Sequence, residues 1–262
     1  MKRVYLHIIA SICVALLWQS KIVGQSTKTT DVIRMLQSED PHQRAAAFSM
    51  AVNSKEVMGS SSMPNTLIDL LNRENTLIVA TLRESKGQDG ISVKYGEAFA
   101  TYYGELLDVC YQRCDRKNPR LVTVLVNSAY SSSSPFAKDL IKEFGRALIS
   151  PLLEKARNDV GNIRMSAIRM LGEFMMLAPG LTSAEKAPIH DAIVSAARDS
   201  DPGVRFSAVE MIGNVGDSRD KELLERIAAG DAAAAPGPRG KTSFPVREEA
   251  QRSLAKIAQR NR

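Results

Sequence analysis

The chain has 262 residues, of which 44% are hydrophobic and 5% aromatic, and its formal net charge is +6. This length is enough for one large domain or a continuous array of repeats, and the lack of alternating apolar runs excludes a fold built mainly from strands. Three of the 35 basic residues lie within residues 1–24, which leaves 32 basic against 29 acidic side chains, without a clustered basic face. We therefore expect an all-α protein that has no nucleic-acid partner.

The first 24 residues have the layout of a secretory signal peptide. A basic start at Lys2 and Arg3 is followed by an apolar run from Val4 to Trp18 and by a polar and small stretch that ends at Gly24. We expect cleavage after Gly24 and a secreted or periplasmic protein. The apolar run is short for a spanning helix of roughly 20 residues, but an uncleaved segment 1–24 that anchors the protein to a membrane stays open as the alternative.

Residues 25–154 are predicted to form divergent helical repeats. Caps, prolines and apolar spacing predict helices at 31–37, 41–53, 64–72, 75–84, 93–115, 136–148 and 151–157, and one that begins after Asn118. Polar or Gly-containing stretches at 60–62, 86–90 and 131–134 are predicted to be loops or breaks.

Residues 155–262 are predicted to form regular repeats. The expected helices are 160–177, 183–198, 202–215, 217–229 and 246–260. The segment 231–243, rich in Ala, Pro and Gly, is predicted to be a loop inserted between the last two helices. With the preceding helices this makes five or six helical pairs.

A recurring motif sets the register of these repeats. Asp201-Pro202 is followed by Val204 and Arg205 and by apolar residues at Ala208, Met211 and Ile212, which form one stripe of a helix. The pattern recurs around Arg164, 41 residues earlier, around Arg247, 42 residues later, and more loosely around Arg44. A period of roughly 40 to 47 residues built from two helices is typical of a helical solenoid.

This pattern resembles that of the HEAT repeat family, which includes short bacterial repeats called phycobilisome-lyase-like. The family's second helix carries Asp-Pro-x-Val-Arg-x-x-Ala-x-x-x-Leu-Gly, and positions 201–213 differ from it only by Ile212 in place of Leu. The resemblance is clearest over 155–262 and weaker over 28–154. It implies a right-handed α-α superhelix in which the repeated Arg is mainly architectural, and it implies little about chemistry.

The repeat also suggests which residues pack and which remain available for binding. Val204, Ala208 and Ile212 should form an apolar seam, and the small Gly172 and Gly213 should let neighbouring helices approach closely. The alternating signs of Arg169, Glu210 and Arg252 suggest salt bridges between neighbouring repeats. The candidate binding residues on the inner helices are Arg169, Glu173, Glu210, Asn214, Arg252 and Lys256.

The sequence contains no pattern typical of catalysis, a metal site or a cofactor. Cys110 and Cys114 are four residues apart on one predicted helix, which favours two reduced thiols over a disulfide or a redox or metal role. His42 and His190 are too far apart in sequence for a recognisable metal motif.

We therefore expect an exported, non-catalytic HEAT-repeat scaffold that binds a protein or peptide along its concave face. One alternative is a chromophore-lyase-like or other enzyme, which would need a deep pocket that gathers Cys110, Tyr111 or His190. The other is a structural subunit tethered to a membrane by its N-terminal segment.

Overall fold

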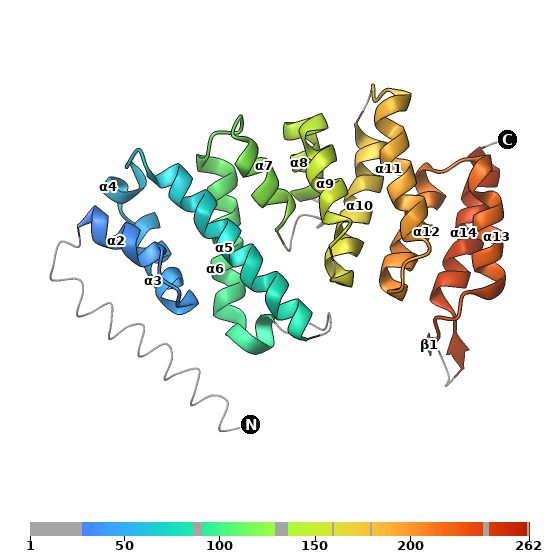
Figure 1. Cartoon of the computed structure of the whole chain (residues 1–262), viewed down its shortest axis with the longest axis horizontal. Coiled ribbons are helices and arrows are strands. Elements are labelled where there is room, and N and C mark those ends of the chain that lie inside the picture. The colour runs from blue at the N-terminus through green and yellow to red at the C-terminus, as the bar shows by residue number, and fades with distance from the viewer. Residues whose placement is uncertain are drawn as a thin grey trace. The chain divides into compact units, whose positions relative to one another are not determined.

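The computed structural model is helical in most of the residues that it describes (Figure 1). It describes residues 28–85, 91–128, 136–158, 160–178, 180–237, 241–260 and 262. The predicted signal peptide and the expected loops at 86–90 and 131–134 lie outside these ranges. By their internal contacts, the described residues form two compact units. The first unit contains the described residues up to Glu74 together with Tyr95–Cys114, and the second contains the described residues of Asn75–Lys94 and those from Asp115 onwards. The predicted all-α class, with helices packed on their neighbours, is confirmed.

The helices follow one another with short connections. Those that contribute to the first unit are α2 (Thr29–Leu36), α3 (Pro41–Val52), α4 (Lys55–Met58), α5 (Met63–Glu84) and α6 (Ile91–Arg113). The second unit continues with α7 (Pro119–Val126), α8 (Phe136–Phe144), a 3₁₀ turn (Gly145–Leu148), α9 (Ile149–Lys155), α10 (Gly161–Leu177) and α11 (Ser183–Ala196). It ends with α12 (Pro202–Val215), a 3₁₀ turn (Ser218–Asp220), α13 (Lys221–Gly230), an antiparallel pair of two-residue strands, β1 (Ala235–Pro236) and β2 (Thr242–Ser243), and α14 (Pro245–Arg260).

The same capping chemistry starts three of these helices. The side chains of Asp40, Asn118 and Asp201 accept hydrogen bonds from the backbone N–H groups two residues later, at 2.9, 3.0 and 2.8 Å. A proline follows each cap at the first helical position, where its missing N–H costs nothing. The motif that marked the repeat in the sequence is therefore a helix-start signal.

The first unit has a charged pair inside its core. Arg44 donates to both carboxylate oxygens of Glu74, at 2.6 and 2.8 Å, and the Tyr102 hydroxyl donates to the same carboxylate at 2.9 Å. Arg44 also donates to the backbone oxygens of Ser38 and Glu39. In the looser repeat, Arg44 therefore binds the backbone of the preceding loop through one guanidinium nitrogen. Its other two nitrogens donate to the buried carboxylate of Glu74.

The second unit contains the predicted seam. Helices α10 and α12 pack against each other, and so do α12 and α14 (Figure 1). Val204, Ala208 and Ile212 are fully buried, as predicted. A Cβ added to Gly172 would come within 2.3 Å of Met211 Sδ, and one added to Gly213 within 2.2 Å of Ser253 Oγ. These two glycines therefore set the close approach of successive inner helices, which confirms their predicted role.

Three predicted boundaries are corrected. The expected helices at 64–72 and 75–84 form one helix, α5, because the polar residues between them are satisfied inside the protein: Glu74 is paired with Arg44, and the buried Asn75 donates to Val124 O at 2.8 Å. The helix expected at 136–148 ends at Phe144, because Gly145 has a φ of 48° and starts a 3₁₀ turn. The inserted loop 231–243 contains the β1–β2 pair.

Candidate functional site

The six candidate binding residues lie on the three neighbouring inner helices of the second unit. Helix α10 carries Arg169 and Glu173, helix α12 carries Glu210 and Asn214, and helix α14 carries Arg252 and Lys256. Arg169 and Arg252 are exposed, and the other four are partly exposed. We call this set of six residues the inner-helix face.

The structure brings part of this face together. Lys256 donates to Asn214 Oδ1 at 3.0 Å, a contact that joins α14 to α12. Glu249 lies beneath it, with its side chain only 7% exposed, and it accepts from Arg252 at 2.7 Å and faces Lys256 at 3.9 Å. The sequence analysis missed Glu249, because it is not one of the fixed positions of the repeat motif. Its spacing of three residues from Arg252 and seven from Lys256 nevertheless places all three side chains on one side of the helix.

The predicted salt bridges between neighbouring repeats are wrong. In the part of the chain that the structure describes, neither Arg169 nor Arg252 forms an ion pair with Glu210. Arg252 instead pairs with a carboxylate one turn away on its own helix, which requires no contact with a neighbouring helix. The charges of Arg169 and Glu210 therefore stay available at the surface.

Glu173 has an unusual setting on this face. Its Oε2 atom is buried and has no hydrogen-bond partner among the described residues. A buried carboxylate oxygen without a donor is costly, because it has lost water without replacement.

The repeated arginines have the architectural role that the family resemblance implied. Arg164 donates to both oxygens of Asp199, at 2.8 and 2.6 Å, and Arg205 donates to Asp231 at 2.7 and 3.2 Å. Arg205 also donates to the backbone oxygens of Asp199 and Ser200. The hydrogen bonds from Arg205 hold the pKa of the Asp231 carboxyl below its usual value. These guanidinium groups are therefore engaged in fixing loops.

Arg247 varies this pattern. Its Nε donates to the backbone oxygen of Asp231, and its guanidinium lies 4.1 Å from the centre of the Phe244 ring. The start of the inserted segment 231–243 is therefore held from both sides, by Arg205 on α12 and by Arg247 on α14.

Lys155 is a buried cation that the sequence did not single out. Its Nζ donates to the backbone oxygens of Val126 and Ser128, at 2.7 and 3.2 Å, and lies 3.3 Å from Ser166 Oγ. Burial lowers its pKa to about 7. The side chain satisfies carbonyl groups at the end of α7, so its role is structural.

Two of the three residues proposed for the enzyme alternative, Cys110 and His190, have hydrogen-bond partners within the fold. Cys110 is fully buried, its thiol donates to Leu67 O at 3.4 Å, and hydrogen bonding with Cys114, followed by burial, raises its pKa. Both thiols are free, as the sequence favoured, and both are buried. His190 Nε2 lies 3.1 Å from Asp220 Oδ2, which also accepts a hydrogen bond from the backbone N–H of Asp217, the cap of a 3₁₀ turn. Cys110 is thus held in the core, whereas the His190 side chain binds Asp220 and stays 22% exposed.

The described residues contain no cluster of three or more His, Cys, Asp or Glu side chains arranged to hold a metal ion. None of the helices within these residues is both long and apolar enough to cross a bilayer.

The comparisons with known proteins identify the repeat. Residues 149–235 match the family model described as HEAT repeats, which spans helices α9 to α13. No curated protein and no solved structure matches the chain significantly. HEAT repeats commonly mediate protein interactions, and stacked helical repeats present extended surfaces suited to that task. With its capped inner helices, glycine-spaced seam and loop-holding arginines, the segment 149–235 is a member of the HEAT repeat family.

Proposed function

We propose that the protein is an exported, non-catalytic scaffold that binds another protein through the inner-helix face. The observation that supports this most is that charged side chains without ion-pair partners stand on closely packed helices. The fully buried seam fixes the spacing of α10, α12 and α14, while Arg169 and Glu210 stand on it without partners among the described residues. A preorganised surface loses little conformational freedom on binding, which favours affinity.

The mixed signs on this face favour a protein partner. Bases at Arg169, Arg252 and Lys256 alternate with acids at Glu173 and Glu210, and such a pattern suits a surface of mixed charge. A nucleic acid would require a continuous basic surface instead. Export rests on the layout of residues 1–24, and sequencing the amino terminus of the native protein tests it. A start near residue 25 supports export, and a start at Met1 supports the membrane-tethered alternative.

Photo-cross-linking in intact cells tests the binding surface. A benzoyl-phenylalanine replaces Arg169, Glu210 or Lys256 in turn, and Glu225 and Arg226 on the exposed side of α13 serve as matched controls. We expect one discrete cross-linked partner from the face positions and none from the controls. Equal products from both sets, or none from the face, would contradict the proposed surface.

A further inference from the structure

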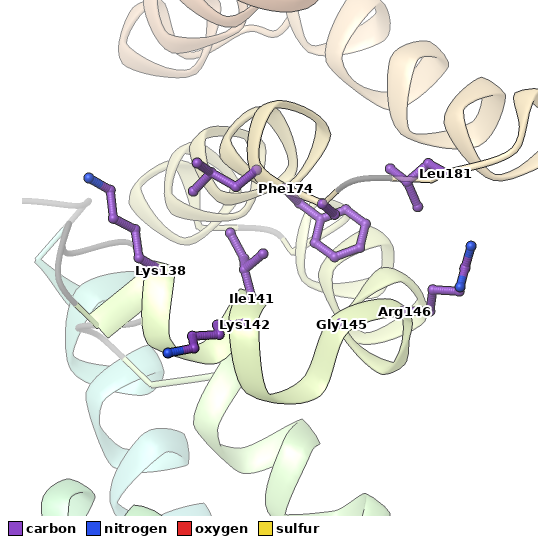
Figure 2. A pocket seen from close by; sticks show the side chains of 9 residues that line it. Lys138, Ile141, Lys142, Gly145, Arg146, Phe174 and Leu181 are labelled. Carbon is purple, nitrogen blue, oxygen red and sulfur yellow. The ribbon is translucent and has the colours of Figure 1, made fainter.

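A second candidate binding feature is lined by residues that do not belong to the inner-helix face. A pocket of about 490 Å³ opens between α8 and the C-terminal end of α10, next to the segment that leads to α11. Figure 2 shows Ile141 directed toward Phe174, with Lys138 and Lys142 on one side of the pocket and Arg146 and Leu181 on the other. Its volume lies in the range of about 300–1,000 Å³ that is typical of ligand-binding sites in proteins.

The interior of this pocket is apolar. Phe174, Ile141 and Leu181 form its walls and are 0, 5 and 8% exposed. Leu177 stands at its mouth with 45% of its surface exposed, and the preceding Met176 is 48% exposed. Val52 is the other large hydrophobic residue that is this exposed in the described ranges, so the exposed apolar surface concentrates beside the pocket. Such a concentration commonly marks a site of protein interaction.

One side of the pocket is basic. Lys138 and Lys142 lie one turn apart on α8, both are exposed, and neither has a hydrogen-bond or ion-pair partner in the described part of the chain. Arg146 is different, because it pairs with Glu185 and donates to Gly180 O at 2.8 Å. Arg146 therefore fixes the wall of the pocket, and the two lysines supply the available positive charge.

The acidic residues of α8 do not neutralise this side. Asp139 and Glu143 are exposed on the same helix but do not line the pocket. Glu143 pairs with Arg116 at 2.6 Å. The combination that faces a ligand is thus an apolar recess with two unpaired ammonium groups beside it.

We propose that this pocket binds an acidic peptide segment of a partner protein. A bulky apolar side chain of the segment enters the recess beside Ile141 and Leu177, and flanking carboxylates meet Lys138 and Lys142. The two lysines are a helical turn apart, about 5–6 Å between Cβ atoms, a spacing that carboxylates on neighbouring peptide residues can match. The inference rests on the proposed protein-binding function and assigns it a second contact with a defined chemistry.

The recess distinguishes a peptide from an anionic membrane surface. A bilayer presents no protruding side chain that could enter a pocket of about 490 Å³, and it would meet only the exposed Leu177 and Met176. A peptide side chain can enter the recess and remove the exposed apolar surface of Leu177 at its mouth from water.

Fluorescence anisotropy with the full exported chain tests the proposal. The probe is a fluorescein-labelled peptide in which Leu-Phe is flanked on each side by three Glu or Asp residues, and a second peptide carries Ser-Ser in place of Leu-Phe. We expect saturable, salt-sensitive binding of the first peptide and at least about tenfold weaker binding of the second, because the apolar side chains provide the anchor.

Variants assign the binding to the pocket. In the double variant Lys138→Glu/Lys142→Glu like charges face each other, so the affinity should fall at least about tenfold. The exposed Leu177→Ser should also weaken binding several-fold, by loss of apolar contact. The double variant Lys117→Glu/Lys221→Glu changes the net charge equally at lysines outside the pocket, and we expect its affinity to stay within about twofold of the parent.

Four results would overturn the inference. They are no saturable binding of the acidic Leu-Phe peptide, an equal loss in both double variants, binding that ignores the Leu-Phe anchor, and binding of phosphatidylglycerol vesicles by a protein that does not bind the peptide. If the peptide fails while Arg169 and Glu210 still cross-link a partner, the pocket assignment is wrong and the proposed function stands. If cross-linking also fails, the proposed function is wrong as well.

Discussion

Replacing Gly213 by Ala should separate helices that the fold holds close together. The added Cβ would lie 2.2 Å from Ser253 Oγ, 2.7 Å from its Cβ and 3.0 Å from its Cα. Because the Cα belongs to the backbone of α14, a rotamer change of Ser253 cannot relieve the contact, and overpacking of this kind costs about 1–3 kcal/mol. Displacing Ser253 also strains its buried hydrogen bond to Val209 O, worth about 1 kcal/mol. The helix propensity of Ala returns about 1 kcal/mol.

The expected net result is a loss of about 1–3 kcal/mol in the free energy of unfolding. Urea denaturation followed by circular dichroism measures it. Gly230→Ala is the matched control, because Gly230 is also helical, belongs to the same unit and has no atom within 4 Å of an added Cβ. We expect the control to be as stable as the parent or slightly more so. A Gly213→Ala variant as stable as Gly230→Ala would refute the close approach of α12 and α14.

Three further predictions concern single side chains. Ile212→Ala should lower the free energy of unfolding by about 2–5 kcal/mol, because Ile212 is fully buried, and urea denaturation measures this. Arg205→Gln should lower it by about 1.5–3 kcal/mol and expose the inserted segment to limited proteolysis, because Asp231 loses its ion pair. Lys155→Met should remove a rise in stability with pH. The folded pKa of Lys155 is about 7 and its ordinary value 10.5, so its burial is fully destabilising below pH 7 and is relieved as the pH rises toward 10.5. The melting temperature of the parent should therefore rise relative to the variant between pH 7 and 9.5, and a constant difference would contradict the lowered pKa.

The sequence predicted best where local chemistry and tertiary packing act together. The helix Pro202–Val215 was predicted to the residue, because Asp201 caps it and Pro202 suits its first position. The seam residue Ile212 and the architectural Arg205 were also predicted correctly, since each repeats at a fixed spacing and the repeat imposes the same surroundings on every copy.

The errors arose where distant residues satisfy polar groups. The sequence predicted a break at residues 73–74 before a helix that begins at Asn75, whereas the buried partners of Glu74 and Asn75 let α5 continue. The sequence did not single out Lys155, because nothing near it in sequence shows that its ammonium group binds a backbone oxygen at the end of α7. Arg252 pairs with Glu249 on its own helix, and it forms this local ion pair in place of the expected salt bridge to Glu210 of the neighbouring repeat.

The pocket could not be predicted for a similar reason. Ile141 and Phe174 are ordinary apolar positions of two helices, and the recess between them depends on how α8 ends. The left-handed backbone of Gly145 stops α8 and turns the chain, so that Arg146 can fix the segment near Gly180. Tertiary geometry therefore creates this candidate site from residues that carry no motif.

A double-mutant cycle between Gly172 and Met211 tests most directly whether successive inner helices stack as HEAT repeats. A Cβ at Gly172 would lie 2.3 Å from Met211 Sδ and 2.6 Å from its Cγ, and Met211→Ala removes both atoms. We expect the double variant Gly172→Ala/Met211→Ala to be more stable, by about 1 kcal/mol or more, than the sum of the single losses implies. Single losses that add to within about 0.5 kcal/mol would mean that α10 and α12 do not touch here, and would contradict the stacked arrangement.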